Sequence, residues 1–305
     1  MRTLIALTLL LATRAAAEPA PSCVADAPAY DRAALRAQIA ALAAPGLDGR
    51  ATGEPGDAAA RALIADRMRC LGLTPAGDDG GFAEPFTTDG RATANVVATV
   101  AGSDPALADE VIAVSAHHDH LGDGHLGAND DASGVAGLLA IAQAIRQHGA
   151  PRRTIAFLAF GGEELGERGS AYFARHARAL FDRVVYDVNL DMIGSYRGAG
   201  AVYAMGTFPA LAGTAIMTDL ARTHRGLKIG LGGRGADSDH EAFCQAGVPY
   251  VFFWTPDKRC YHARCDTIDH LDDAHAAQIA EVAGALVERL GNADHLARVP
   301  HACAR

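Results

Sequence analysis

The chain has 305 residues and half of them are hydrophobic, which is enough for one large domain with a substantial core. The formal net charge is −9 and no run of basic residues occurs, so we expect no nucleic acid partner. Beyond the N-terminal segment, no apolar stretch is long enough to cross a bilayer.

The N-terminal residues have the pattern of an export signal. Arg2 precedes an apolar stretch over residues 4–12, which is too short to span a membrane, and three alanines precede Glu18. We therefore predict that residues 1–17 are a signal peptide and that residues 18–305 form a single domain. The protein would be periplasmic or secreted, with no stable membrane insertion after cleavage.

All six cysteines follow the predicted cleavage site. An even number of cysteines in an exported chain favours disulfide bonds. The expected pairs are Cys260 with Cys265, from their proximity in sequence, and, as guesses, Cys23 with Cys70 and Cys244 with Cys303. Since no Cys-x-x-Cys pattern occurs, we do not expect a structural zinc finger.

The first predicted elements are two amphipathic helices, over residues 31–44 and 57–71. Asp57 is the expected N-cap of the second helix, and Gly72 is its expected stop. A strand follows in the stretch ANVVATVAG, around residue 95.

Strands and helices then alternate towards the C-terminus. Continuous apolar runs such as VIAVSA and TIAFLAF predict strands that are buried on both faces. In chain order, the predictions are a strand over 111–116, a helix over 134–148, strands over 154–160, 184–192 and 201–206, a helix over 210–224, a strand over 250–255 and a helix over 273–290. This alternation predicts an α/β fold, a three-layer sandwich with a mostly parallel, mixed central sheet and helices on both faces.

Acidic and histidine side chains follow three of the predicted buried strands at equivalent places. His117 and Asp119 follow the first strand, Glu163 and Glu164 follow the second, and Asp191 closes the third. The carboxyl ends of parallel strands meet at one side of a sheet, where ligands of such folds bind. Imidazole nitrogens and carboxylate oxygens are the usual ligands of catalytic zinc. The pattern therefore predicts a zinc site at the carboxyl ends of the strands.

Other residues of the same region fit this zinc site. Asp119 lies two residues after His117, where it can accept the second ring N–H of a metal-bound imidazole. Asp130 and Asp131 open a predicted helix, where backbone N–H groups favour anions and a fixed carboxylate can bridge two cations. The two adjacent glutamates can divide their roles, one binding metal and the other transferring protons.

Six ordered motifs carry a resemblance to a known family: AHHDHLG, GANDDASGVA, FGGEELGERGS, NLDMIG, SDHEAF and YHARCDT. Their order resembles that of the dizinc aminopeptidase family, which includes bacterial leucyl aminopeptidases and has glutamate carboxypeptidase and glutaminyl cyclase as relatives. The segment LDGRATGEPG also resembles the family's pre-catalytic segment. The similarity covers nearly the whole mature chain and implies a single zinc peptidase domain.

The resemblance implies two zinc ions per chain and a role for each motif residue. The implied ligands are His117 and Asp191 for one zinc, Glu164 and His262 for the other, and Asp130 as the bridge. Glu163 would be the general base that takes a proton from the attacking water, and Asp119 would orient His117. The other implied supporting residues are Asp131, Asp239 and Asp266. The family commonly has a cis peptide bond after the bridging residue, which here would join Asp130 to Asp131.

The implied function is an exported metallo-exopeptidase, an aminopeptidase that acts on peptides with a free N-terminus. A dizinc carboxypeptidase or dipeptidase is the main alternative, although such relatives usually carry further domains and basic residues for a carboxylate. Glutaminyl cyclase is less favoured because it works with one zinc, whereas this chain has the full ligand set. A binding module without metals is least favoured.

Two departures from the family pattern leave questions open. The first motif contains three additional histidines, which we expect to be solvated or to support the ligands: His118, His120 and His125. Some bacterial members have a tyrosine that assists the oxyanion where this chain has Gly235. That role would be vacant, or Arg234 or Tyr261 would fill it.

Overall fold

The computed structural model of the chain describes residues 27–208, 212–299 and 302–304. The predicted signal peptide and Cys23 lie outside these ranges, as do the first residues of the helix predicted over 210–224. Among the described residues, none of the helices combines the length and the apolar character that crossing a membrane requires.

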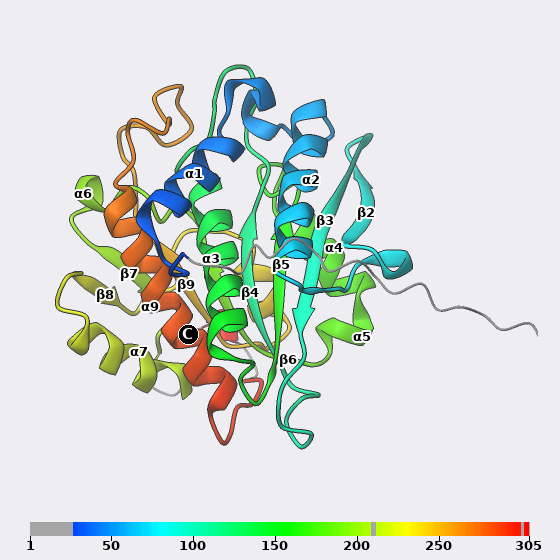
Figure 1. The fold of residues 1–305 in the computed structure, drawn as a ribbon, viewed down its shortest axis with the longest axis vertical. Coiled ribbons are helices and arrows are strands. Elements are labelled where there is room, and N and C mark those ends of the chain that lie inside the picture. Colours follow the sequence, from blue (N-terminus) through cyan, green and yellow to red (C-terminus); the bar gives the residue numbers. More distant parts are fainter. Residues whose placement is uncertain (1–26, 209–211, 300–301, 305) are drawn as a thin grey trace, which may run out of the picture.

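The elements alternate along the chain as the sequence predicts (Figure 1). The helices are α1 (Arg32–Leu42), α2 (Pro55–Cys70), α3 (Ala132–His148), α4 (Arg168–His176), α5 (Arg178–Phe181), α6 (Tyr196–Ala199), α7 (Ala212–Thr223), α8 (His240–Gln245) and α9 (Asp273–Asn292), with 3₁₀ turns η1 (Pro45–Arg50), η2 (Asp78–Gly80) and η3 (Ala302–Ala304). The strands are β1 (Thr74–Pro75), β2 (Ala83–Thr88), β3 (Arg91–Val100), β4 (Val111–His117), β5 (Thr154–Phe160), β6 (Val184–Leu190), β7 (Val202–Met205), β8 (Ile229–Leu231) and β9 (Tyr250–Trp254).

In the described part of the chain the strands form one nine-stranded sheet, in the order β1-β3-β5-β4-β6-β9-β7-β8, with β2 paired to β3. The central strands β5, β4, β6 and β9 are parallel to one another, whereas the pairs on either side of them, β3 with β5 and β7 with β9, are antiparallel. The sheet is therefore mixed with a parallel centre, as predicted.

The register of the parallel strands brings their carboxyl ends together. His117 at the end of β4 pairs with Phe160 at the end of β5, and Leu190 at the end of β6 pairs with Phe253 of β9. The residues that follow these strands consequently emerge side by side at one side of the sheet.

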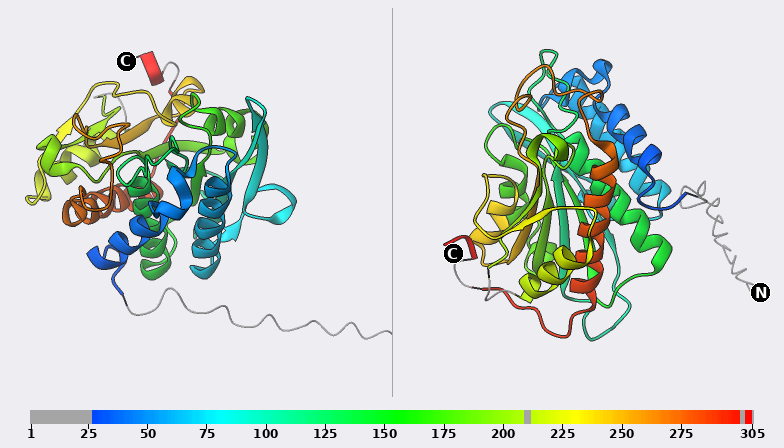
Figure 2. Two further views of the ribbon diagram at one scale, coloured as in Figure 1. Left: turned by 90° about the horizontal axis from the view of Figure 1, so that it is seen from above. Right: turned by 90° about the vertical axis from the view of Figure 1, so that its left-hand side faces the viewer.

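Alternate residues of the central strands face two separate cores. Ile112 and Val114 of β4 pack in a cluster with α1, α2, α3, α7 and α9, the face seen in Figure 1. Val111 and Ala113 pack in a second cluster with the aromatic side chains of α4, α5 and α8. The side views show these helices on both sides of the sheet (Figure 2). The predicted three-layer sandwich is therefore confirmed.

The predicted strands and the long helices are confirmed to within a few residues, with one correction at a helix start. Helix α2 begins at Pro55, so Asp57 lies in its first turn and is not the N-cap. Proline suits the first position of a helix because its missing N–H has no partner there anyway. The Asp57 carboxylate instead accepts the N–H of Gly53 and contacts His118. The short elements β1, β2, β8, α4, α5, α6 and α8 were not predicted.

Two of the three expected cysteine pairs can be examined in the described residues. The Cα atoms of Cys244 and Cys303 lie 4.9 Å apart, and those of Cys260 and Cys265 lie 5.3 Å apart. Both separations are typical of disulfide bonds. The expected pair of Cys23 with Cys70 lies outside the described residues because Cys23 does.

Candidate metal centre

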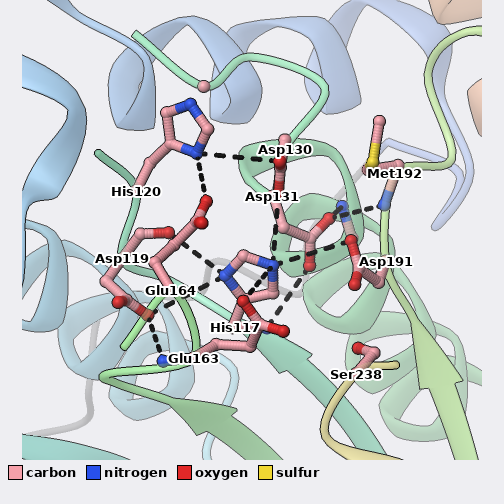
Figure 3. Close-up of polar contacts among 12 residues, drawn as sticks. His117, Asp119, His120, Asp130, Asp131, Glu163, Glu164, Asp191, Met192 and Ser238 are labelled. Carbon is pink, nitrogen blue, oxygen red and sulfur yellow. Dashed lines mark hydrogen bonds and ion pairs between the residues drawn. The ribbon is translucent and has the colours of Figure 1, made fainter. Parts of the chain in front are cut away.

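The side chains that the sequence singles out converge at the carboxyl ends of the central strands (Figure 3). His117 is the last residue of β4, Asp191 follows β6 directly, and Glu163 and Glu164 lie in the turn after β5. Asp130 immediately precedes Asp131, the N-cap of α3. The loop after β9 brings His262 to the same place, although it follows Asp130 by 132 positions in the sequence.

One group of atoms gathers around the His117 ring. Its Nε2 lies 3.3 Å from Oδ1 of Asp130 and 3.6 Å from Oδ1 of Asp191. Oε2 of Glu163 is 3.8 Å from the same nitrogen. A second group gathers around the other carboxylate oxygen of Asp130, because Nε2 of His262 lies 3.2 Å from Oδ2 of Asp130.

The second group also contains Glu164, whose Oε2 lies 3.1 Å from Nε2 of His262. The two oxygens of Asp130 thus face different sets of side chains, Oδ1 towards His117 and Oδ2 towards His262. A carboxylate in this position can coordinate two cations at once.

The chemistry of these atoms fits a divalent metal. Within the described chain, Nε2 of His117, Oδ2 of Asp130 and Oδ1 of Asp191 are buried and make no hydrogen bond of acceptable geometry. Buried polar atoms without partners are costly, and converging imidazole and carboxylate atoms are the ligands that zinc prefers. Burial alone would raise the pKa of Asp130, but its contacts with His117 and His262 lower it below the ordinary value.

His120 belongs to the centre more closely than the sequence analysis anticipates. Its ring is buried, and Nδ1 lies 2.6 Å from Oε1 of Glu164 and 3.8 Å from Oδ2 of Asp130. With Asp130 and Glu164 it forms one of the groups that could hold a metal ion. The expectation of a solvated residue is wrong for His120, whereas a supporting or ligating role agrees with these contacts.

The other two additional histidines make structural contacts away from the two groups of candidate metal ligands around Asp130, which are called the metal groups below. Nε2 of the buried His118 lies 3.0 Å from Oδ1 of Asp57 and so connects β4 to α2. Nδ1 of His125 lies 2.9 Å from the carbonyl oxygen of Gly122 within its own loop.

Asp119 supports Glu163 more directly than His117. Its Oδ1 accepts the backbone N–H of Glu163 at 3.1 Å, and its Oδ2 accepts the hydroxyl of Thr52 at 2.7 Å. Nδ1 of His117 is 3.1 Å from the main-chain carbonyl of Asp119 but 3.8 Å from its carboxylate. The ring is therefore oriented by the backbone of Asp119, because its carboxylate is already engaged elsewhere.

Asp131 connects three parts of the site. Its Oδ1 accepts the N–H groups of Gly134 and Met192, and its Oδ2 accepts the N–H of His117. It thereby joins the start of α3 to the ends of β4 and β6. The peptide bond between Asp130 and Asp131 is cis, as the resemblance implied.

Asp266 contacts the backbone of the loop that leads to Asp130. Its carboxylate accepts the N–H groups of Asn129 and Asp130 at 2.7 and 3.0 Å. Asp266 therefore supports the loop that leads to Asp130, although in the sequence it lies close to His262.

The SDHEAF segment lies mostly beneath the site. Asp239 is buried, and burial raises its pKa to about 7. Ser238 accepts a hydrogen bond from Asn189, and the ring of His240 packs between Tyr250 and Phe252, with ring centroids 4.4 and 4.8 Å away. These residues support the sheet below the metal groups, while the preceding Ala236 and Asp237 line the cavity.

A cavity of about 310 Å³ opens onto the metal groups. Its polar wall contains His117, Asp130, Glu163, Asp191 and His262. Its apolar wall contains Met192, Phe252, Trp254, Pro256 and Tyr261. Asp237, Asp257 and Lys258 complete the lining.

Of the two residues considered for the oxyanion, one lines the cavity. Tyr261 does so, and its ring stacks on that of His262 with centroids 3.8 Å apart. Nη2 of Arg234 lies 2.8 Å from Oε1 of Glu241 and is engaged there. The geometry therefore favours Tyr261 over Arg234.

Comparison with known families places this chain in a defined class. Residues 95–287, well over half of the chain, match the model of peptidase family M28. The chain belongs to peptidase family M28. The class expected from the motifs, a zinc-dependent hydrolase, is the class of this family and of its named relatives.

Individual relatives are similar to the chain over different lengths. Leupeptin-inactivating enzyme 1 of Streptomyces exfoliatus is 28% identical over 294 residues, covering 85% of this chain and 62% of the relative. Aminopeptidase YwaD of Bacillus subtilis is 29% identical over 190 residues, covering 58% of this chain and 40% of the relative. The chain thus spans less than two thirds of the length of these curated relatives.

Solved structures share the fold at low sequence identity. A zinc aminopeptidase from Bacillus subtilis superimposes with a TM-score of 0.73 at 17% identity, over 90% of this chain and 97% of that one. Glutaminyl cyclase from Porphyromonas gingivalis superimposes with a TM-score of 0.68 at 18% identity, over 87% of this chain and all of the other. The architecture is therefore common to proteins with different activities.

Proposed function

We propose that the protein is an exported aminopeptidase that binds two zinc ions and removes N-terminal residues from peptides with a free N-terminus. The single observation that carries this proposal is the orientation of Asp130, whose two oxygens face two separate ligand groups. His117 and Asp191 would hold one zinc, Glu164 and His262 the other, and Asp130 both.

The bound metals would supply Lewis acidity, which polarises the scissile carbonyl and makes a water molecule a stronger nucleophile at neutral pH. Glu163 lies beside the proposed metal ligand His117, with its Oε2 3.8 Å from Nε2 of that ring, and it lines the cavity. Burial raises the pKa of Glu163 well above its ordinary value. A carboxylate of this kind can take a proton from the attacking water and return it to the leaving amine.

The surroundings of Glu163 suit that proton transfer. Its backbone N–H donates to Asp119, so the main chain that carries the Glu163 side chain is held next to the end of β4. Tyr261 borders the same cavity and can donate its hydroxyl to the developing oxyanion.

The cavity supports an exopeptidase with an apolar preference. Asp237 and Asp257 line the cavity and are not among the proposed metal ligands, so they provide negative charge for the substrate's α-ammonium group. The apolar wall, which includes Met192, Phe252 and Trp254, suits the side chain of an apolar N-terminal residue. The printed names of several relatives, including an aminopeptidase and a probable leucine aminopeptidase, point the same way.

One observation favours the second candidate, a dizinc carboxypeptidase or dipeptidase. Lys258 lines the cavity and is the cation there that could bind a substrate carboxylate. Two carboxylates that are not among the proposed metal ligands, Asp237 and Asp257, line the same cavity and outweigh the charge of Lys258. This balance favours a ligand with a free amine.

Export to the periplasm or the medium belongs to the same proposal. The pattern of residues 1–17 and the two cysteine pairs at disulfide separation support it, because disulfides persist in oxidising compartments.

The experiment that tests the proposal combines metal content with substrate choice. We expect two zinc ions per chain, hydrolysis of leucine p-nitroanilide and no hydrolysis of its N-acetyl form. Glu163→Gln should retain both zinc ions and lose activity by about 10²- to 10⁴-fold, as expected for removal of a general base. Two zinc ions without hydrolysis of the free-amine substrate would favour the carboxypeptidase or dipeptidase. One zinc, or none, would contradict the paired centre.

A further inference from the structure

Arg50 is a fully buried arginine next to the metal centre, and the activity proposed above gives it no role. It ends η1 in a turn where Asp48, Gly49 and Arg50 all have positive φ angles. The turn packs closely against the 122–125 loop, since a Cβ on Gly49 would lie 2.0 Å from the carbonyl oxygen of His125. The side chain of Arg50 is 0% exposed.

Each N–H of the Arg50 guanidinium donates to a main-chain carbonyl. Nε donates to His118 at 2.6 Å, Nη1 to Leu42 and Leu126 at 2.9 and 2.8 Å, and Nη2 to Gly127 and Asp130 at 2.9 and 3.4 Å. An arginine side chain has five N–H donors, so the whole donor set is used on backbone oxygens.

Four of these five carbonyls belong to the two segments that carry the candidate ligands, and the fifth, that of Leu42, ends α1. His118 directly follows His117 at the end of β4, and residues 126–130 form the loop that ends at the bridging carboxylate. One planar group therefore sets the distance between the backbone beside His117 and the backbone of Asp130.

Asp266 binds the N–H groups of the same loop, whereas Arg50 binds its carbonyl groups. Its carboxylate accepts the N–H groups of Asn129 and Asp130, while Arg50 donates to the carbonyls of Gly127 and Asp130. The two backbone polar groups of Asp130 are thus bound by two buried, oppositely charged side chains. This arrangement leaves the Asp130 carboxylate as the part of the residue directed at the metal groups.

Charge gives Arg50 a second effect on the centre. The negative groups that attract it most are Asp131, Asp266, Asp130 and Asp119. A fixed cation among these carboxylates reduces their mutual repulsion before any metal binds.

We propose that Arg50 is a positioning residue that holds the His117 and Asp130 segments in the geometry for paired metal binding in the metal-free protein. The proposal rests on the paired metal centre proposed above. Lysine cannot replace arginine here, because its ammonium has three donors and no planar fork that could span five carbonyls.

Arg153 offers a matched control for the test. It is also 0% exposed and also donates to main-chain carbonyls, those of Leu290 and Ala293, but it lies at the amino end of β5, away from the metal groups. Arg50→Lys and Arg153→Lys therefore remove similar contacts at opposite ends of the strands.

The experiment measures Zn²⁺ affinity by chelator competition for the metal-free wild type and both variants, together with the visible spectra of their Co²⁺ forms. We expect Arg50→Lys to weaken zinc binding by about 10- to 100-fold, the range seen for residues behind metal ligands, and to alter the cobalt spectrum. Arg153→Lys should lower the unfolding midpoint and leave both metal readouts unchanged.

Unchanged zinc affinity and cobalt spectrum in folded Arg50→Lys would overturn the proposal, and so would equal losses in both variants. If wild type itself binds no zinc, the proposed function fails as well. Zinc binding by wild type that Arg50→Lys leaves intact overturns the positioning role alone.

A second measurement uses the unmodified chain, in case Arg50→Lys does not fold. We expect the Nε–H of Arg50 to exchange slowly with solvent in nitrogen-detected NMR of the wild type, both without metal and after zinc is added. Fast exchange that becomes slow only with zinc would show that metal orders the segments, which would overturn the proposal.

Discussion

The two buried arginines lie at opposite ends of the central strands, and their partners differ. Arg153, at the amino end of β5, has a carboxylate partner, because its Nε lies 2.7 Å from Oε2 of Glu110. Arg50, at the carboxyl ends, donates to five main-chain carbonyls. Nearby carboxylates such as Asp130 keep an oxygen without a hydrogen bond.

The comparison separates what stabilises the fold from what prepares the site. At the amino ends, the charge of Arg153 is paired with the Glu110 carboxylate, and this ion pair stabilises the fold. At the carboxyl ends, the charged side chains are supported through the backbone, so their own ligand atoms stay directed at one another and at the cavity. Without a metal, such an arrangement lowers the stability of the folded protein, and the binding of a cation raises it again.

The largest effect should come from the bridging residue itself. Asp130→Asn leaves one carboxylate-like oxygen and should therefore bind at most one metal tightly. We expect kcat/KM to fall about a thousandfold or more, since metal catalysis contributes several kcal/mol. Zinc counting and hydrolysis of leucine p-nitroanilide measure the result.

Asp123→Asn is the matched control for this substitution. Asp123 lies in the same stretch, its side chain is 90% exposed and its partner is Arg264 on the surface. It should retain metals and activity. Two retained zinc ions and activity within tenfold of wild type in Asp130→Asn would contradict the bridging role.

At the opposite ends of the strands, Arg153→Met should lower stability without affecting chemistry. The substitution leaves Glu110 without its partner and removes donors to the carbonyls of Leu290 and Ala293. We expect the free energy of unfolding in urea to fall by about 3 kcal/mol, the lower end of the range for breaking a buried ion pair, because Glu110 is partly exposed. A parallel loss of kcat/KM per folded molecule would break the distinction between the two ends.

Glu84 extends the comparison because its buried carboxyl group, unlike Oδ2 of Asp130, has a hydrogen-bond partner, Asn95. Asn95 donates to it at 2.7 Å and accepts the N–H of Gly161, so the pair supports the turn that leads to Glu163. Burial raises the pKa of Glu84 to about 7 from 4.5. The folded protein therefore binds this proton more tightly than the unfolded chain, and stability falls as pH rises from 4.5 to about 7.

Glu84→Gln removes this ionisation and keeps an oxygen for Asn95. We expect equal stability of variant and wild type at the acid end of that range. At about pH 8 the variant should be more stable by about 2 kcal/mol. Urea unfolding of the metal-free proteins at both pH values measures the difference. A variant that is less stable than wild type at about pH 8 would refute the assignment.

The smallest effect concerns the loop of His262. The side chain of His262 is 36% exposed, in contrast to the buried His117, and Cys260 and Cys265 enclose it. Replacing both cysteines by serine should weaken the zinc held by His262 by about tenfold or less, because ordering one more residue costs about 1 kcal/mol. Zinc titration should show two unequal sites, and equal weakening of both would argue against a local effect.

Sequence patterns predicted the parts of the fold and site that have a simple period or position. Continuous apolar runs predicted β4, β5 and β6, and the ends of these strands led to His117, Glu163 and Asp191. His262 lies in an irregular loop, so only the resemblance to a family indicated it.

The remainder depends on contacts that leave no pattern in the sequence. Arg50 donates to backbone carbonyls, which every residue possesses, so no residue type or spacing in the sequence indicates its partners. The sequence analysis named Asp266 as a supporting residue and left His120 as solvated or supporting, but it could not give their partners, because local spacing does not tell which loop a side chain meets in space. Strand β2 contains Glu84 and Pro85, residue types that are depleted in strands, and α8 has six residues, fewer than two helical turns.

The hydrogen bond from the N–H of Asp130 to Asp266 spans 136 positions of the chain. A growing or partly unfolded polypeptide therefore has an incomplete centre until the loop after β9 has docked, because Asp130 lacks its contact with Asp266 and the second group lacks His262. The proposed peptidase activity would in this way depend on the docking of this late segment, and a chain that is cut before the loop should be inert towards peptides.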